Sequence, residues 1–151
     1  MTVPSARPRR IAHVLLLDRS LDRVLLSGKE DILSPPSVLL RPGQGYHKAA
    51  VEAARTWWGV DSLPIGRVTG HGWCGAPDQR TSERSLLMAS LAHLPEPVRS
   101  NLPEGPAGCR WWQLADLRQH PGPTSPVDLH LIIEGYWDGW LPDGPLSVDW
   151  C

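Results

Sequence analysis

The chain has 151 residues and a formal net charge of -1, which suits a single domain with one sizeable core. A charge this small offers no broad basic face for nucleic acid and no polybasic patch for a membrane surface. No apolar run approaches the ~20 residues that a membrane-spanning helix needs. We therefore expect neither nucleic acid nor a membrane as a partner.

The three cysteines, Cys74, Cys109 and Cys151, form no C-x-x-C pair and leave an odd number. This usage favours reduced thiols over a disulfide framework or a zinc site. Residues 1–9 lack the apolar core of a signal peptide, and we interpret them as an N-terminal tail. The expected location is therefore cytoplasmic.

Apolar runs predict two neighbouring strands at the start of the chain, residues 11–17 and 23–26, separated by turn residues. Pro35-Pro36 then interrupts any regular element, because proline fixes φ and lacks an N–H donor. A short third strand is expected at residues 38–40, and Pro42-Gly43 forms a turn after it.

A helix is predicted from Tyr46 to Trp58, where apolar residues recur at helical spacing. Its expected buried stripe consists of Tyr46, Ala49, Ala50, Ala53, Ala54 and Trp57. Glu52 lies off that stripe, and Gly59 occupies the position where a C-terminal cap favours a left-handed residue. The helix is therefore delimited at its end by sequence alone.

The second half of the chain predicts three more strands, residues 65–73, 85–94 and 109–114. A closing helix follows, with Ser125 at its N-cap, Pro126 at its first position and a buried stripe that extends to Trp140. Strands, helix, strands and helix in this order predict a single-domain α+β sandwich.

The stretch from Pro35 to Val60 resembles the Nudix box. That family's pattern is a Gly, five residues, a Glu, seven residues, Arg-Glu, an aliphatic, any residue, Glu-Glu, any residue, a Gly and an aliphatic. Placing Gly59-Val60 on its last two positions needs no gap, and Pro42-Gly43 then falls on the loop turn. The resemblance covers residues 10–141 and implies a Nudix-like α/β/α sandwich with a mixed sheet. Residues 142–151 are then a C-terminal tail.

The positions that carry the family's acidic residues differ in this chain. The substitutes are Gln44 and Ala53 for two single glutamates, Thr56 and Trp57 for the Glu-Glu pair, Glu52 for the arginine and Val38 for the first glycine. In active members, as the resemblance implies, the glutamates bind magnesium or manganese and help to activate the attacking water. Alanine supplies no ligand and glutamine is neutral. We expect no metal cofactor here, and magnesium or manganese only if residual Nudix activity exists.

Other residues are candidates to replace the lost chemistry. His13, His71 and His93 lie in or beside predicted strands and, with Glu52, are the remaining catalytic candidates. No spacing such as H-x-x-x-H supports a metal triad, so three unrelated histidines are the alternative. Glu83 lies where some Nudix enzymes carry an auxiliary acid.

Trp57 either fills the cleft that the metal vacates or stacks on an aromatic ligand there. Gln44, Thr56 and Trp73 complete the expected ligand-binding set. Three hypotheses follow: a hydrolytically silent domain that binds a nucleotide-like or aromatic small molecule, an enzyme with non-standard catalytic residues, and a structural or regulatory interaction domain. The sequence leaves a homodimer open.

Overall fold

The computed structural model describes residues 8–28, 31–75, 81–100 and 108–151. In chain order the elements are β1 (Arg9–Asp18), β2 (Arg23–Ser27), β3 (Ser37–Leu39), α1 (Tyr46–Trp58), β4 (Ile65–Cys74), β5 (Ser82–Ser90), α2 (Glu96–Ser100), β6 (Cys109–Gln113), α3 (Leu114–Arg118), α4 (Leu129–Trp137) and β7 (Gly144–Ser147). Short 3-10 helices follow β1 and β5. Of the expected N-terminal tail 1–9, residues 1–7 lie outside the described residues, and Arg9 already belongs to β1.

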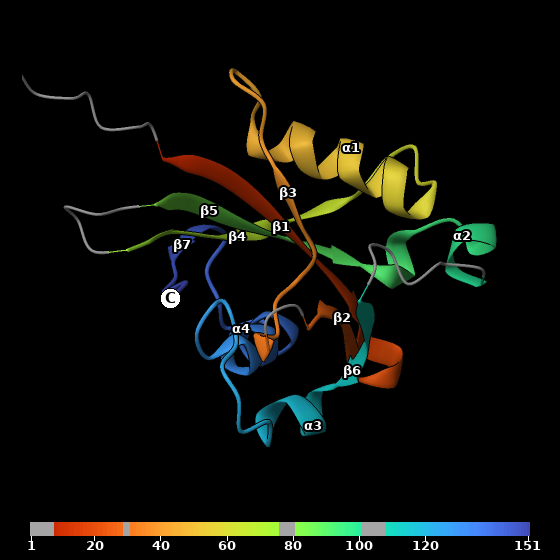
Figure 1. Ribbon diagram of the computed structural model, residues 1–151. Helices are drawn as coiled ribbons and strands as arrows, with labels where there is room; N and C mark the ends of the chain where they lie inside the picture. Colours follow the sequence, from red (N-terminus) through yellow and green to blue (C-terminus); the bar gives the residue numbers. More distant parts are fainter. Residues whose placement is uncertain (1–7, 29–30, 76–80, 101–107) are drawn as a thin grey trace, which may run out of the picture.

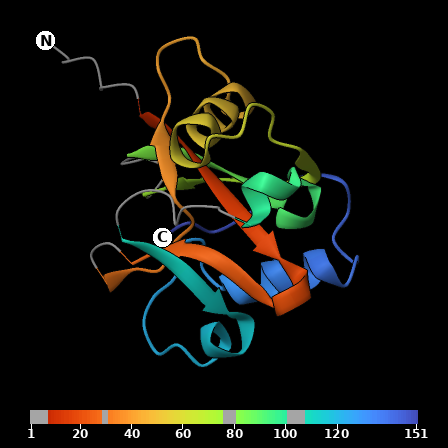
Figure 2. The same cartoon turned by 90° about the vertical axis from the view of Figure 1, so that its right-hand side faces the viewer.

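The strands form one mixed sheet in the order β6-β2-β1-β5-β4-β7, with β3 also paired to β1. The pairs β1–β5 and β4–β7 are parallel, and the other pairs are antiparallel. Figures 1 and 2 show α1 on one side of the sheet and α4 on the other. The predicted α+β class, with helices on both faces of a mixed sheet, is confirmed.

Each face of the sheet has its own apolar core. Along β1, Ala12, Val14 and Leu16 pack with the buried face of α1, whereas Leu15 and Leu17 pack with α4. Successive side chains of a strand point to opposite faces, so a strand buried on both faces is apolar at nearly every position. This explains the continuous apolar run at the start of the chain.

Helix α1 has the predicted limits, Tyr46–Trp58. Gly59 follows in the left-handed conformation, with φ of 68°, and its N–H donates to the Arg55 carbonyl. Glycine adopts this conformation without the steric cost that a Cβ brings. The N-cap is Gly45, which offers no side-chain cap.

The predicted cap of the closing helix is wrong. Helix α4 begins at Leu129, three residues after the predicted first position Pro126, and the Ser125–Pro126 peptide is cis. Ser125 Oγ donates instead to the Trp150 carbonyl at 2.7 Å, so a long-range contact takes the hydroxyl that the local pattern assigned to the helix. At the other end, Trp140 lies beyond the helix and is 63% exposed.

Residues 142–151, expected to be a tail, are part of the structure. They contain β7, which pairs with β4, and Trp150, which is 1% exposed. Gly72 in β4 permits this close approach, because a Cβ added there would lie 2.2 Å from the Val148 carbonyl oxygen. The C-terminal segment therefore completes one edge of the sheet.

The expectation of three reduced thiols is also wrong. Cys74 and Cys151 form a disulfide, and Cys109 is buried and is not part of it. The paired cysteines are 77 residues apart, and no local spacing in the sequence indicates that they pair. Because persistent disulfides are typical of oxidising compartments, the cysteines no longer support a cytoplasmic location. Within the described ranges, no helix has the length and apolar character needed to cross a membrane.

Candidate functional site

The substituted box positions lie together around one open pocket. Its volume is about 270 Å³, and it is lined by Val38, Leu39, Arg41, Gln44, Ala49, Glu52, Ala53, Thr56 and Trp57. Six of these residues occupy the positions that the box pattern assigns to its Gly, Arg and Glu residues. Strand β3, the loop after it and the side of α1 nearest that loop supply them, and two of the helix residues, Ala49 and Ala53, are buried.

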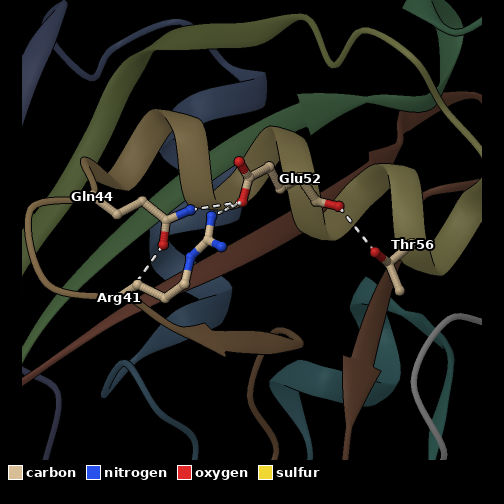
Figure 3. Close-up of polar contacts among 4 residues, drawn as sticks. All are labelled: Arg41, Gln44, Glu52 and Thr56. Atoms are coloured by element: carbon tan, nitrogen blue, oxygen red, sulfur yellow. Dashed lines mark hydrogen bonds and ion pairs between the residues drawn. The ribbon is translucent and has the colours of Figure 1, made fainter.

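Glu52 lines this pocket, and its side chain accepts hydrogen bonds from two donors (Figure 3). Its Oε2 accepts a hydrogen bond from Arg41 Nη2 at 2.9 Å and another from Gln44 Nε2 at 2.8 Å. The Gln44 Oε1 in turn accepts from the Arg41 main-chain N–H at 3.0 Å. Glu52 lies off the buried stripe of α1, as expected, and the loop after β3 folds back along the helix and brings both donors to it.

The residues of this pocket do not fit a divalent metal ion. Magnesium prefers an octahedral set of oxygen ligands with carboxylate charge. Glu52 is the one acidic residue among the described residues that line the pocket, and its carboxylate is already paired with the Arg41 guanidinium. No group of three or more His, Cys, Asp or Glu side chains within the described residues is arranged to hold a metal.

The two tryptophans at the end of α1 have different environments. Trp58 is 4% exposed and belongs to the core beneath the helix, a role that the sequence stripe assigned to Trp57. Trp57 is half-buried, contacts Trp58 edge-on with ring centroids 5.5 Å apart, and lines the pocket. Trp57 therefore forms a wall of an open space, and its ring does not fill it.

Trp73 does not join this group. It lies on β4 opposite Glu83 of β5 and outside the residues that line the box pocket. Thr56 does line it, with its hydroxyl donating to the Glu52 carbonyl at 3.2 Å. The structure thus brings together Gln44, Thr56 and Trp57, but not the fourth expected ligand-binding residue.

The three candidate histidines have separate surroundings, as the alternative of three unrelated histidines predicts. His13 is buried on the α4 face of β1, and His93 is exposed at the end of the 3-10 helix after β5. His71 lies on the α1 face, with Nε2 3.3 Å from Glu83 Oε1 and its ring edge-on to Tyr46. Side-chain alternation puts His13 and His71 on opposite faces of the sheet.

A second pocket, of about 600 Å³, surrounds His13 on the α4 face. The His13 Nδ1 lies 3.0 Å from the Pro35 carbonyl oxygen, so this nitrogen carries the proton and donates. Its Nε2 therefore accepts from Arg84 Nη1 at 2.9 Å. Burial lowers the pKa of His13 to about 4, the hydrogen bond to Pro35 opposes that shift, and the Arg84 charge adds to it.

These contacts change the role expected of His13, and they bring into its site two residues that the sequence did not indicate. A neutral imidazole whose lone pair is occupied by a guanidinium is poorly placed to act as a general base. Arg84 and Trp150 belong to the same site, and the His13 and Trp150 ring centroids are 4.5 Å apart. His13 and Arg84 are 71 residues apart, so only the register between β1 and β5 brings them together.

Solved structures of several Nudix hydrolases resemble this fold. The Ap4A hydrolase of C. elegans has a TM-score of 0.62 at 12% identity, over 89% of this chain and 100% of that chain. A NUDIX hydrolase from Nitrosomonas europaea has a TM-score of 0.55 at 19% identity, over 93% of this chain and 94% of that chain.

A third similar structure is a bifunctional NMN adenylyltransferase/ADP ribose pyrophosphatase from Francisella tularensis, complexed with AMP and a manganese ion. Its TM-score is 0.61 at 12% identity, over 90% of this chain and 43% of that chain. No protein-family model matches the sequence, and no curated protein matches it. The chain therefore has a Nudix-like fold. At these low sequence identities the similarity shows the fold alone.

Proposed function

We propose that this chain is a Nudix-fold protein that binds a nucleotide-like or aromatic small molecule in the box pocket and lacks metal-dependent diphosphate hydrolysis. One observation carries the proposal. The box positions meet around a single pocket, yet the one carboxylate that they supply, on Glu52, is paired with Arg41 and bonded by Gln44. Such a pocket keeps the geometry of a binding cleft without the ligands that magnesium requires.

The chemistry of the walls supports the class of ligand. Trp57 offers a half-buried aromatic surface, on which a flat ring gains both apolar burial and favourable ring contacts. Arg41, 70% exposed at its side chain, pairs with Glu52 through Nη2, and its remaining guanidinium N–H groups at the pocket rim suit a phosphate or another anion. Two of the similar structures, an Ap4A hydrolase and a complex with AMP, favour nucleotides as the first ligands to test.

A hydrolysis assay tests the proposed lack of diphosphate hydrolysis. The protein is incubated with magnesium or manganese and a panel of nucleoside diphosphate derivatives, including diadenosine tetraphosphate and ADP-ribose, and the nucleotide products, such as AMP, are separated by chromatography. We expect no product above the blank. Turnover that EDTA abolishes overturns the proposal, and turnover that persists in EDTA supports instead an enzyme with non-standard catalytic residues.

A thermal-shift screen with the same panel and with free aromatic compounds tests binding. A ligand that binds only the folded state raises the melting temperature. We expect such a shift to disappear in Trp57→Ala and to remain in Trp140→Ala, the matched removal of a tryptophan that is 63% exposed. Absence of every shift contradicts binding and favours the interaction-domain hypothesis.

A further inference from the structure

The pocket on the α4 face is larger than the box pocket and lies on the other side of the sheet. Its volume of about 600 Å³ is within the usual range for small-molecule sites, and its surface is mainly apolar. Pro35, Pro36, Ile32, Val127 and Trp150 supply that apolar surface. An apolar pocket of this size accommodates a whole small organic molecule.

Arg84 brings a positive charge into this apolar space. Its side chain comes from β5 on the same face as His13, donates from Nε to Ser82 Oγ at 2.9 Å and from Nη1 to His13 Nε2 at 2.9 Å. Both acceptors are neutral, so these hydrogen bonds do not compensate the positive charge. Among the described residues, the other three of the five guanidinium N–H groups have no hydrogen-bond acceptor. A half-buried cation of this kind favours an anion beside it.

Within residues 8–28, 31–75, 81–100 and 108–151, no acidic side chain balances this charge. Among the described residues that line the pocket none has an acidic side chain, and no ion pair joins Arg84 to an acidic group of the described chain, the main-chain carboxylate of Cys151 included. The neighbouring Glu83 points to the other face, toward His71. Burial lowers the pKa of Arg84 from its ordinary value, because removal from water disfavours the charged guanidinium.

His13 fixes the direction of this cation. Because Nδ1–H donates to the Pro35 carbonyl, Nε2 can only accept, and it holds Nη1 of Arg84 in place. Trp150 packs against the other side of the imidazole, and its indole N–H is buried without an acceptor among the described residues. The pocket therefore combines an oriented cation with polar residues such as Ser125 and the apolar surface of Trp150.

We propose that this pocket binds a small organic carboxylate, whose anion pairs with Arg84 and whose apolar body lies against Trp150 and Pro36. One guanidinium balances one negative charge, so a monoanion fits better than a diphosphate, whose remaining charge would be buried in apolar surroundings. His13 is a positioning residue of this site, since it orients Arg84 and need not touch the ligand.

Paired probes test the proposal. Benzoate, 2-naphthoate, indole-3-acetate and octanoate are titrated by calorimetry, each beside its neutral amide, with inorganic phosphate as a further anion. We expect at least one carboxylate to bind saturably and its amide roughly tenfold or more weakly, as the loss of a charge-assisted hydrogen bond predicts. Equal affinity of acid and amide, or no saturable binding by any carboxylate at millimolar concentration, overturns the proposal.

Variants place the binding in the structure. Arg84→Gln removes the charge and should weaken the carboxylate to the level of its amide, whereas Arg84→Lys should retain part of the preference. His13→Gln should weaken carboxylate binding without changing amide binding, an effect that a merely structural role does not produce. Trp57→Ala should leave this site unchanged, so failure here is distinguishable from failure of the box pocket. Carboxylate binding that Arg84→Gln leaves intact contradicts the assignment.

Discussion

The buried His13 predicts a specific loss of stability in mild acid. Its ring is 1% exposed, and its pKa of about 4 lies below the value near 6.5 that the unfolded chain gives it. The unfolded state therefore binds the proton more readily, and the stability contributed by neutral His13 is fully present above pH 6.5 and is lost as the pH falls toward 4. Between pH 7 and pH 5 this difference amounts to about 2 kcal/mol.

The perturbation that isolates this effect is His13→Gln, which removes the titrating group and retains an amide able to donate and accept. Denaturant unfolding at a series of pH values gives the free energy of unfolding for both proteins. We expect the wild-type protein to lose about 2 kcal/mol more than the variant between pH 7 and pH 5. The other histidines are present in both proteins, so their contributions cancel in the comparison.

Two results refute this reasoning. If both proteins show the same pH dependence, His13 does not titrate with a lowered pKa. If NMR titration of the His13 ring gives a pKa near 6.5 in the folded protein, the imidazole is neither buried nor paired with Arg84 as described.

Three further predictions concern stability, each measured by denaturant unfolding. Reduction of the disulfide, or Cys151→Ser, should cost up to about 4 kcal/mol, since the bond closes a long loop in the unfolded chain. Gly72→Ala should cost about 1–3 kcal/mol, because the added Cβ meets the Val148 carbonyl oxygen at 2.2 Å. Trp58→Ala should cost about 3–5 kcal/mol, and Trp57→Ala clearly less, because only Trp58 is fully within the core.

Each of these has a contradicting outcome. Thiol titration of the unreduced, denatured protein should find one reactive thiol, that of Cys109, and a count of three thiols would contradict the disulfide. Wild-type stability in Gly72→Ala would show that the C-terminal segment does not lie against β4. Equal costs for Trp57→Ala and Trp58→Ala would mean that the box pocket is packed shut.

Local patterns predicted the features that depend on local physics. The helical spacing and Gly59 defined α1 because an amphipathic stripe and a left-handed cap are properties of adjacent residues. The gap-free spacing of the box also predicted that Gln44, Ala53, Thr56 and Trp57 share one site, since a fixed loop and a helix set their relative positions. That site could be assembled from the sequence without any long-range contact.

Long-range contacts account for the features that the sequence did not reveal. The disulfide, the Ser125–Trp150 hydrogen bond and the Arg84–His13 pair each join residues far apart in the chain. Ser125 illustrates the competition, because a sound capping pattern was overridden by a carbonyl 25 residues later. The partners of Glu52 were missed for a related reason, since Arg41 and Gln44 come from the preceding loop and not from its own helix.

Manganese binding tests the central claim most directly, because the proposed lack of diphosphate hydrolysis rests on the proposed lack of a metal site. Electron paramagnetic resonance of Mn²⁺ reports the free ion, whose signal falls when a protein binds it. With a box pocket in which Glu52 is paired to Arg41, we expect the free-ion signal to be unchanged at micromolar metal and protein. Saturable micromolar binding that Glu52→Gln abolishes would contradict the account and restore the box as a metal site.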